Sequence, residues 1–152
     1  MAKHPAWTKR LLSDADLDAI AAAIARAESE TSGMIKVHLE RRVPGHGGDA
    51  LGRAQAVFAH LRMHQTVERH AVLVYLALED RKLAILGDAG IHARVGDAYW
   101  NAIRDHMVDR LRAGASREAI LGAVQELGRV LREHFPRRPG DVQDSGDDLT
   151  VR

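Results

Sequence analysis

The sequence predicts an α/β fold, a three-layer-type sandwich in which four helices flank a small mixed sheet. Residues 71–78 are apolar at every position, which is typical of a strand buried on both faces. Residues 82–86 form a second apolar run after a short charged turn, so the two runs are predicted to pair as an antiparallel hairpin. Apolar residues at helical spacing lie on both sides of this hairpin. The predicted order is therefore α-β-α-β-β-α-α.

The first helix is predicted over residues 14–30. Ser13 suits its N-cap, and acidic side chains in the first turn are favoured by the helix dipole. Residues 34–40 then alternate apolar and polar side chains, which indicates a half-buried strand with an ordinary polar face. The polar residues of this strand are Lys36, His38 and Glu40.

A second helix, from Asp49 to about Met63, connects this strand to residues 71–78. A strand, a crossover helix and a second strand imply a parallel pair. The sheet is therefore predicted to contain two parallel strands plus the antiparallel hairpin partner. Two more helices follow, over residues 97–113 and 116–135.

The helices and strands give one α/β domain over residues 11–136. Residues 137–152 are polar and without periodicity, and they are predicted to form a disordered C-terminal tail. The acidic character of this tail also leaves open a role as a recognition segment for a protein partner.

Composition narrows the possible functions. The chain has 152 residues, of which 45% are hydrophobic and 28% charged, as expected for one folded soluble domain. A net charge of +1 argues against a nucleic-acid partner. The absence of cysteine excludes disulfides, thiolate zinc sites and cysteine nucleophiles. The longest apolar run is far short of the about 20 residues that span a bilayer, and no secretory signal is visible. We therefore expect no membrane span and a cytoplasmic location.

Several short motifs, in this order and spacing, resemble the TPM-domain family. They are residues 12–14 (LSD), 28–33 (ESETSG), 71–75 (AVLVY), 84–91 (AILGDAGI), 99–100 (YW) and 134–136 (HFP). The family includes thylakoid acid-phosphatase-like proteins linked to photosystem II repair and many bacterial proteins of unsettled role. The resemblance implies a divalent-metal site, often calcium, in an acidic groove, and phosphatase activity in some members. The family commonly has glutamate after the Thr-Ser-Gly turn, where this chain has Met34.

The predicted sheet offers ligands at two ends. Open α/β sheets usually bind ligands at the carboxyl ends of their parallel strands. The opposite end is favoured here because it coincides with the family resemblance and brings together the oxygen ligands that hard cations prefer. The predicted metal ligands are Asp88, Asp97, Glu68 and Ser32, and the expected ion is calcium or another divalent cation.

Each candidate also has an ordinary structural role. Asp88 and Asp97 suit turn or N-cap positions. Trp100 shares an apolar stripe and is expected in the core rather than stacked on a ligand. His60 and His64 have the spacing of a metal pair, but a third ligand is missing, so half-buried or solvated histidines are expected.

Besides partner binding through the acidic tail, the sequence leaves two functions open. The first is a binding or accessory module with a weak or vestigial divalent-metal site. The second is a metal-dependent, acid phosphatase-like hydrolase, for which no nucleophile is evident.

Overall fold

The computed structural model describes residues 5–45, 48–141 and 148–152. Within these residues, five α-helices, two short 3-10 helices and four strands follow one another. In chain order they are η1 (Ala6–Arg10), α1 (Asp14–Glu28), β1 (Met34–Glu40), α2 (Ala50–His60), η2 (Met63–Gln65), β2 (Ala71–Ala77), β3 (Lys82–Gly87), α3 (Ala89–Val95), α4 (Asp97–Arg112), α5 (Ser116–His134) and β4 (Leu149–Val151).

The four strands form one mixed sheet in the order β3-β2-β1-β4. β1 and β2 are parallel, with Met34 opposite Ala71 and Glu40 opposite Ala77. β3 runs antiparallel to β2 as the second strand of the hairpin. The parallel pair and the hairpin predicted from the sequence are thus confirmed.

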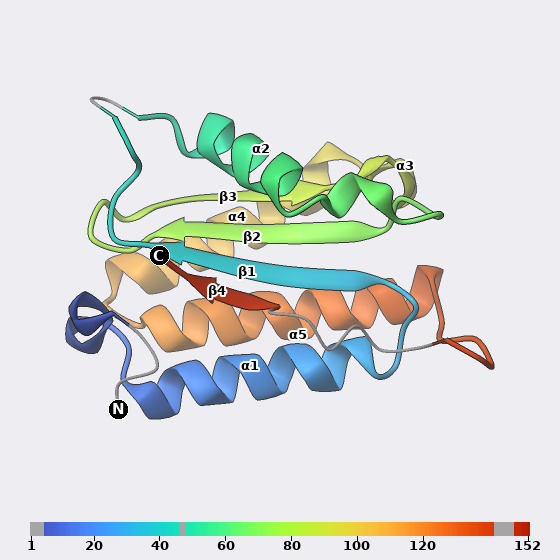
Figure 1. Cartoon of the computed structure of the whole chain (residues 1–152), viewed down its shortest axis with the longest axis horizontal. Helices are drawn as coiled ribbons and strands as arrows, with labels where there is room; N and C mark the ends of the chain where they lie inside the picture. The colour runs from blue at the N-terminus through green and yellow to red at the C-terminus, as the bar shows by residue number, and fades with distance from the viewer. Residues whose placement is uncertain (1–4, 46–47, 142–147) are drawn as a thin grey trace.

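Helices cover both faces of the sheet, which gives three layers (Figure 1). α1, α4 and α5 lie on one face, and α2 lies on the other. β2 supplies side chains to both interfaces: Val72 and Val74 belong to the cluster with α1, α4 and α5, whereas Leu73 and Tyr75 belong to the cluster with α2. A strand covered on both faces needs apolar residues at every position, which explains the continuous apolar run.

α1 begins directly after Ser13, the N-cap residue that the sequence predicts. Ser13 Oγ accepts a hydrogen bond from the Asp16 amide at 3.0 Å, and the Asp16 carboxylate accepts one from the Ser13 amide at 3.0 Å. This reciprocal capping box satisfies amides that the helix itself leaves without partners.

The structure contains a fifth helix that the sequence analysis did not predict. α3 has only seven residues, too few for an apolar periodicity to be recognised. Its N-cap is Asp88, whose side chain accepts a hydrogen bond from the Ala89 amide at 2.8 Å. The ordinary role expected for Asp88 as a cap is therefore the one it has.

The prediction of disorder for residues 137–152 needs correction at its end. Leu149–Val151 forms β4, which pairs in parallel with β1 and places Val37 opposite Leu149. The Val37 amide donates to the Asp148 carbonyl at 2.7 Å. A three-residue strand carries too short a pattern to be recognised from sequence. Residues 142–147 of the predicted tail lie outside the described residues.

The polar face of β1 is buried rather than solvated. Glu40 is only 3% exposed and accepts hydrogen bonds from the Arg53 guanidinium of α2 and the Tyr75 hydroxyl, the latter at 2.7 Å. His38 lies 3.1 Å from the Glu40 carboxylate through Nε2, and its Nδ1 contacts the Thr150 hydroxyl of β4. The expectation of an ordinary polar face is wrong because α2 and β4 together cover it. We call Glu40, Arg53, Tyr75, His38 and Thr150 the β1 polar cluster.

No helix among the described residues is long and apolar enough to cross a bilayer.

Candidate functional site

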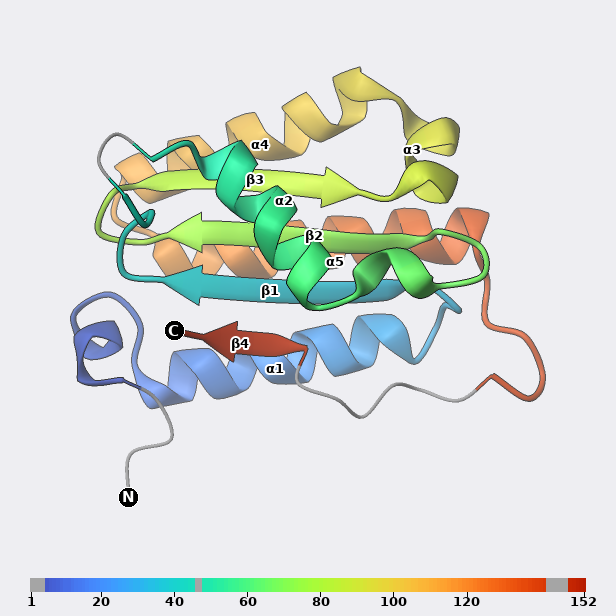
Figure 2. The same cartoon turned by 45° about the horizontal axis from the view of Figure 1, so that its top comes forward.

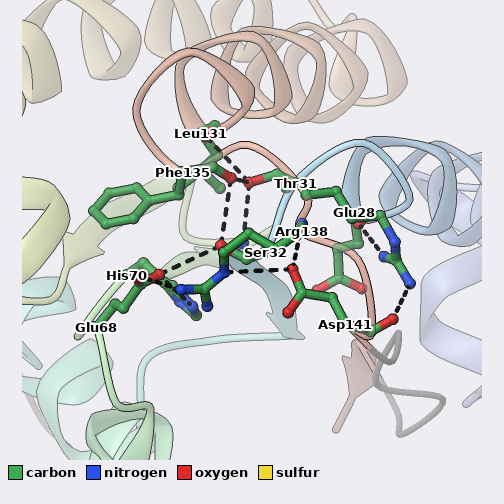
Figure 3. Close-up of polar contacts among 11 residues, drawn as sticks. Glu28, Thr31, Ser32, Glu68, His70, Leu131, Phe135, Arg138 and Asp141 are labelled. Carbon is green, nitrogen blue, oxygen red and sulfur yellow. Dashed lines mark hydrogen bonds and ion pairs between the residues drawn. The ribbon is translucent and has the colours of Figure 1, made fainter.

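A pocket of about 240 Å³ lies at the end of the sheet where β1 and β2 begin. Its walls come from the end of α1, the turn before β1, the loop before β2 and the loop after α5. Figure 3 shows the polar contacts in this region. The polar residues that line the pocket include Glu28, Thr31, Ser32, Glu68, His70 and Asp141.

The turn between α1 and β1 is tied to the end of α5. The Thr31 hydroxyl lies within hydrogen-bond distance of the Leu131 and Phe135 carbonyls, and it accepts from the Gly33 amide at 3.0 Å. The Ser32 amide donates to the Phe135 carbonyl at 3.0 Å. A Cβ on Gly33 would lie 2.8 Å from a methyl group of Leu131, so glycine permits this close approach. The turn therefore holds Ser32 in a fixed place at the pocket.

Ser32 and Glu68 meet in the pocket, and an arginine of the loop after α5 joins them. The Ser32 hydroxyl donates to Glu68 Oε2 at 3.4 Å, while Arg138 Nη1 donates to Glu68 Oε1 at 3.1 Å. The Arg138 backbone amide also donates to the Asp141 carboxylate at 2.7 Å. The carboxylates of Glu68 and Asp141 thus both contact Arg138 (Figure 3).

Two buried side-chain atoms among the described residues lack a hydrogen-bond partner, and both belong to residues that line this pocket: Glu28 Oε1 and His70 Nδ1. The other Glu28 oxygen accepts from the Ile35 amide at 2.9 Å. Burial, followed by the neighbouring Asp148 carboxyl, raises the pKa of Glu28 to about 9. Burial also lowers the pKa of His70. At neutral pH we therefore expect a protonated Glu28 and an uncharged His70.

Replacing Glu28 by glutamine is expected to stabilise the protein at about pH 8 by more than about 1 kcal/mol. The pKa of Glu28 is raised on folding from 4.5 to about 9, so the folded state holds the proton more tightly. The stabilisation of the wild type by this tighter proton binding is complete below about pH 4.5 and is lost as the pH rises toward 9. Glutamine does not titrate, so E28Q does not show this loss. Urea unfolding of both proteins at about pH 4, 6 and 8 measures the difference.

The control for this substitution is Glu30→Gln, two residues away, where the carboxylate is half-exposed and pairs with Arg132 at 2.6 Å. E30Q removes only an exposed ion pair and should change stability by less than about 1 kcal/mol at each of these pH values. Parallel stability curves for wild type and E28Q would contradict the raised pKa.

The structure places Asp88 and Asp97 outside this pocket. Both Asp88 oxygens accept from the Arg69 guanidinium, at 2.6 and 2.8 Å, and the pKa of Asp88 is lowered, because hydrogen bonds from Arg69 and the Ala89 amide outweigh its burial. The Asp97 side chain is 90% exposed and lies 3.6 Å from a His92 ring nitrogen. Of the four predicted ligands, the structure brings together only Ser32 and Glu68. Among the described residues, no group of three or more histidine, aspartate or glutamate side chains is arranged to hold a metal ion.

One family model matches most of this sequence. The TPM-domain family model matches residues 7–130. The chain belongs to the TPM-domain family. No functionally curated protein matches the sequence.

Solved structures of TPM-like proteins share the fold over most of this chain. The NMR structure of the BA42 protein from the psychrophilic bacterium Bizionia argentinensis is 31% identical, with a TM-score of 0.81 over 93% of this chain and 95% of that one. The N-terminal domain of a P. gingivalis protein is 19% identical, with a TM-score of 0.66 over 84% of this chain and 83% of that one. The N-terminal domain of the cg2496 protein from Corynebacterium glutamicum is 17% identical, with a TM-score of 0.62 over 100% and 93%. The latter two show likeness of fold alone.

In this TPM domain, Met34 lines the pocket beside Ser32 and Glu68. This is the position where the family resemblance leads us to expect glutamate. Met34 is one strand removed from Asp88, because Met34 is opposite Ala71 and the Asp88 amide donates to the carbonyl of that same Ala71. Met34 is therefore a neighbour of Ser32 and Glu68 rather than of Asp88.

Sequence reasoning did not identify Glu28, Arg138 or Asp141 as part of the site. Glu28 carried a readable signal: it follows Ile20 and Ile24 at four-residue spacing, so it continues the buried stripe of α1 with a carboxyl. Arg138 and Asp141 had no such signal, since they lie in a loop that only the fold brings to the pocket.

Proposed function

We propose that this TPM domain is a binding module whose pocket at Ser32 and Glu68 holds a divalent cation weakly. The observation that carries the proposal is the buried Glu28 carboxyl, whose Oε1 has no hydrogen-bond partner among the described residues although Glu28 lines the pocket. A buried polar atom without a partner is costly, and a bound cation would satisfy it.

The chemistry of the pocket fits a hard cation in part. Calcium prefers several oxygen ligands, and carboxylates, hydroxyls and carbonyls all serve. Ser32 and Glu68 bring a hydroxyl and a carboxylate together, and the carboxyls of Glu28 and Asp141 line the same pocket. Among the described residues no three acidic side chains are arranged around one point, so a cation would draw mainly on Ser32, Glu68 and water. A cation that also contacts Glu28 would have to displace its proton, so its affinity should increase with pH.

Two features of this chain weaken the site. Met34 offers no oxygen where a further carboxylate is expected. Arg138 already contacts Glu68 at 3.1 Å, so a cation would have to compete with the Arg138 guanidinium for the Glu68 carboxylate. We infer that the chain has retained the pocket but lost most of its cation affinity.

Met34→Glu is expected to tighten calcium binding by about tenfold or more, because affinity increases with the number of charged ligands. Arg138→Ala should tighten it as well by freeing Glu68, whereas Glu68→Gln should weaken it. Calorimetric titration of the full chain with calcium chloride measures all four proteins.

Glu30→Gln is the matched control and should bind as wild type does, since its carboxylate pairs with Arg132 outside the pocket. Equal titration curves for wild type, M34E, R138A and E68Q would refute a cation role for this pocket.

A metal-dependent phosphatase is the second function that the family resemblance suggests. Hydrolysis of a phosphate ester requires a nucleophile or metal-activated water besides the cation. Ser32 is the pocket hydroxyl that donates to a carboxylate. Calcium- or magnesium-dependent hydrolysis of p-nitrophenyl phosphate that is lost in S32A, even at a cation concentration that saturates the variant, would favour the phosphatase over the binding module.

A further inference from the structure

β3 is an edge strand, and one side of its backbone faces away from the sheet. It pairs with β2, and no strand among the described residues lies on its other side (Figure 2). The Asp88 amide donates to the Ala71 carbonyl at 2.9 Å, which fixes the phase of the antiparallel ladder. Lys82, Ala84 and Leu86 therefore direct their backbone groups toward β2. The backbone groups of Leu83, Ile85 and Gly87 point outward.

A groove of about 830 Å³ runs along this free edge. The residues of β3 from Lys82 to Ile85 line it, together with the start of α2 on one side and α4 on the other. Trp100 closes the groove at the end of β3, where a Cβ on Gly87 would meet the indole ring at 2.2 Å. The outward backbone groups of Leu83 and Ile85 consequently point toward this groove between two helices, where Leu83 is 7% exposed and Ile85 is half-buried.

The charges of the groove are predominantly positive. Four cationic residues line it against a single carboxylate, that of Asp49, which already accepts from two amides at the start of α2. The cationic residues are Arg81, Lys82, Arg104 and Arg112. Among the described residues, none of the three arginines forms an ion pair, whereas Lys82 donates to the Gly48 carbonyl at 3.2 Å. Apolar side chains, including Ile85 and Val108, lie between these charges.

We propose that this groove binds an extended acidic peptide segment of a partner protein, which adds to β3 as a further strand. An edge strand offers unpaired backbone donors and acceptors to such a peptide, and side-chain contacts supply selectivity. Acidic side chains of the peptide meet the arginines, and apolar ones pack between α2 and α4. The opposite edge of the same sheet is completed in a comparable way, because Leu149–Val151 adds there to β1. This inference is independent of the cation pocket, which lies at the loop before β2.

The test uses the full chain and a fluorescein-labelled peptide of alternating sequence, DVDIDV, with KVKIKV as its charge-reversed counterpart. Fluorescence anisotropy at low salt should show binding of DVDIDV and not of KVKIKV. Arg104→Glu and Arg112→Glu, both exposed on α4, should each weaken binding by about tenfold or more. Arg26→Glu, an exposed arginine of α1 away from the groove, is the matched control and should not change it.

Amide NMR identifies the binding mode. Addition of DVDIDV should shift the Leu83 and Ile85 amides most, and their hydrogen exchange should slow as they gain partners. A DVDIDV analogue N-methylated at alternate residues should lose affinity, since it cannot complete the ladder.

Several results would overturn the proposal: no binding at about 1 mM peptide, equal binding of KVKIKV, an equal effect of R26E, or shifts centred away from β3. Sedimentation equilibrium tests whether a second copy of this chain occupies the groove instead. A wild-type dimer that R104E dissociates would assign the groove to a second copy of this chain and refute a separate partner.

Discussion

Replacing Trp100 by alanine is expected to lower the free energy of unfolding by about 3–5 kcal/mol. The indole is 9% exposed and belongs to the cluster formed with α1 and α5, so its removal leaves a cavity against β3. The ring also covers Gly87, and its Nε1 donates to a His92 ring nitrogen at 2.9 Å. The sequence-based expectation that Trp100 belongs to the core is confirmed.

Urea unfolding followed by far-UV circular dichroism measures this loss, because the substitution removes one of only two tryptophans that fluorescence would report. Asn101→Ala, at the next and exposed position of α4, is the control and should change stability by less than about 0.5 kcal/mol. A W100A protein within about 1 kcal/mol of wild type would mean that the indole contributes little to the core.

Arg53→Ala is expected to cost about 2–4 kcal/mol near neutral pH, because it leaves the Glu40 carboxylate buried without its main cationic partner. Glu40 is 3% exposed, and Arg53 contacts both of its oxygens. Burial alone would raise the pKa of Glu40, but hydrogen bonds from Arg53, Tyr75 and His38 outweigh it and lower that pKa to about 2.

The β1 polar cluster also predicts how the free energy of unfolding changes in acid. Glu40 has a lower pKa in the folded state than its ordinary 4.5, so its stabilising contribution is complete above about pH 4.5 and is lost as the pH falls toward 2. The shift corresponds to about 3 kcal/mol. R53A should lose less stability than wild type over this range, as urea unfolding between about pH 7 and 2.5 would show.

Two further variants serve as controls for the R53A measurement. Arg41 forms an exposed ion pair with Glu79 at the same end of the sheet, and R41A should cost less than about 1 kcal/mol. The double variant E40Q/R53M should recover stability relative to R53A, since it removes the buried charge together with its partner. An R53A loss no larger than that of R41A would contradict a structural role for the buried pair.

The sequence was sufficient for the main architecture because its strongest patterns are local. The apolar run at residues 71–78 required cover on both faces, and the hairpin after it left one antiparallel arrangement for β3. α3 and β4 were missed for a different reason. Each is short, and β4 depends on pairing with residues more than a hundred positions earlier in the chain.

The candidate site was only half predictable. Ser32 and Glu68 flank strands whose pairing could be inferred, so their convergence at the pocket followed from topology. Asp88 lies at the same end of the sheet, but nothing in the sequence revealed that Arg69, with a left-handed backbone at φ 55°, would bind both of its oxygens. The burial of His38 and Glu40 was equally hidden, because it depends on α2 and on a strand that was not expected.

The late position of β4 in the chain has a consequence for folding. The contact between His38 and Thr150 closes a loop of 112 residues, whereas β2 and β3 meet through a tight turn. Closing a long loop costs more conformational entropy than closing a short one, and the three residues of β4 form few hydrogen bonds to offset it. We therefore expect β4 to dock after the other three strands have assembled, and to detach first in the native ensemble. Until it docks, water retains access to His38. In native-state hydrogen exchange, the Val37 amide, which donates to Asp148, should accordingly open at a lower free energy than the amides shared by β2 and β3.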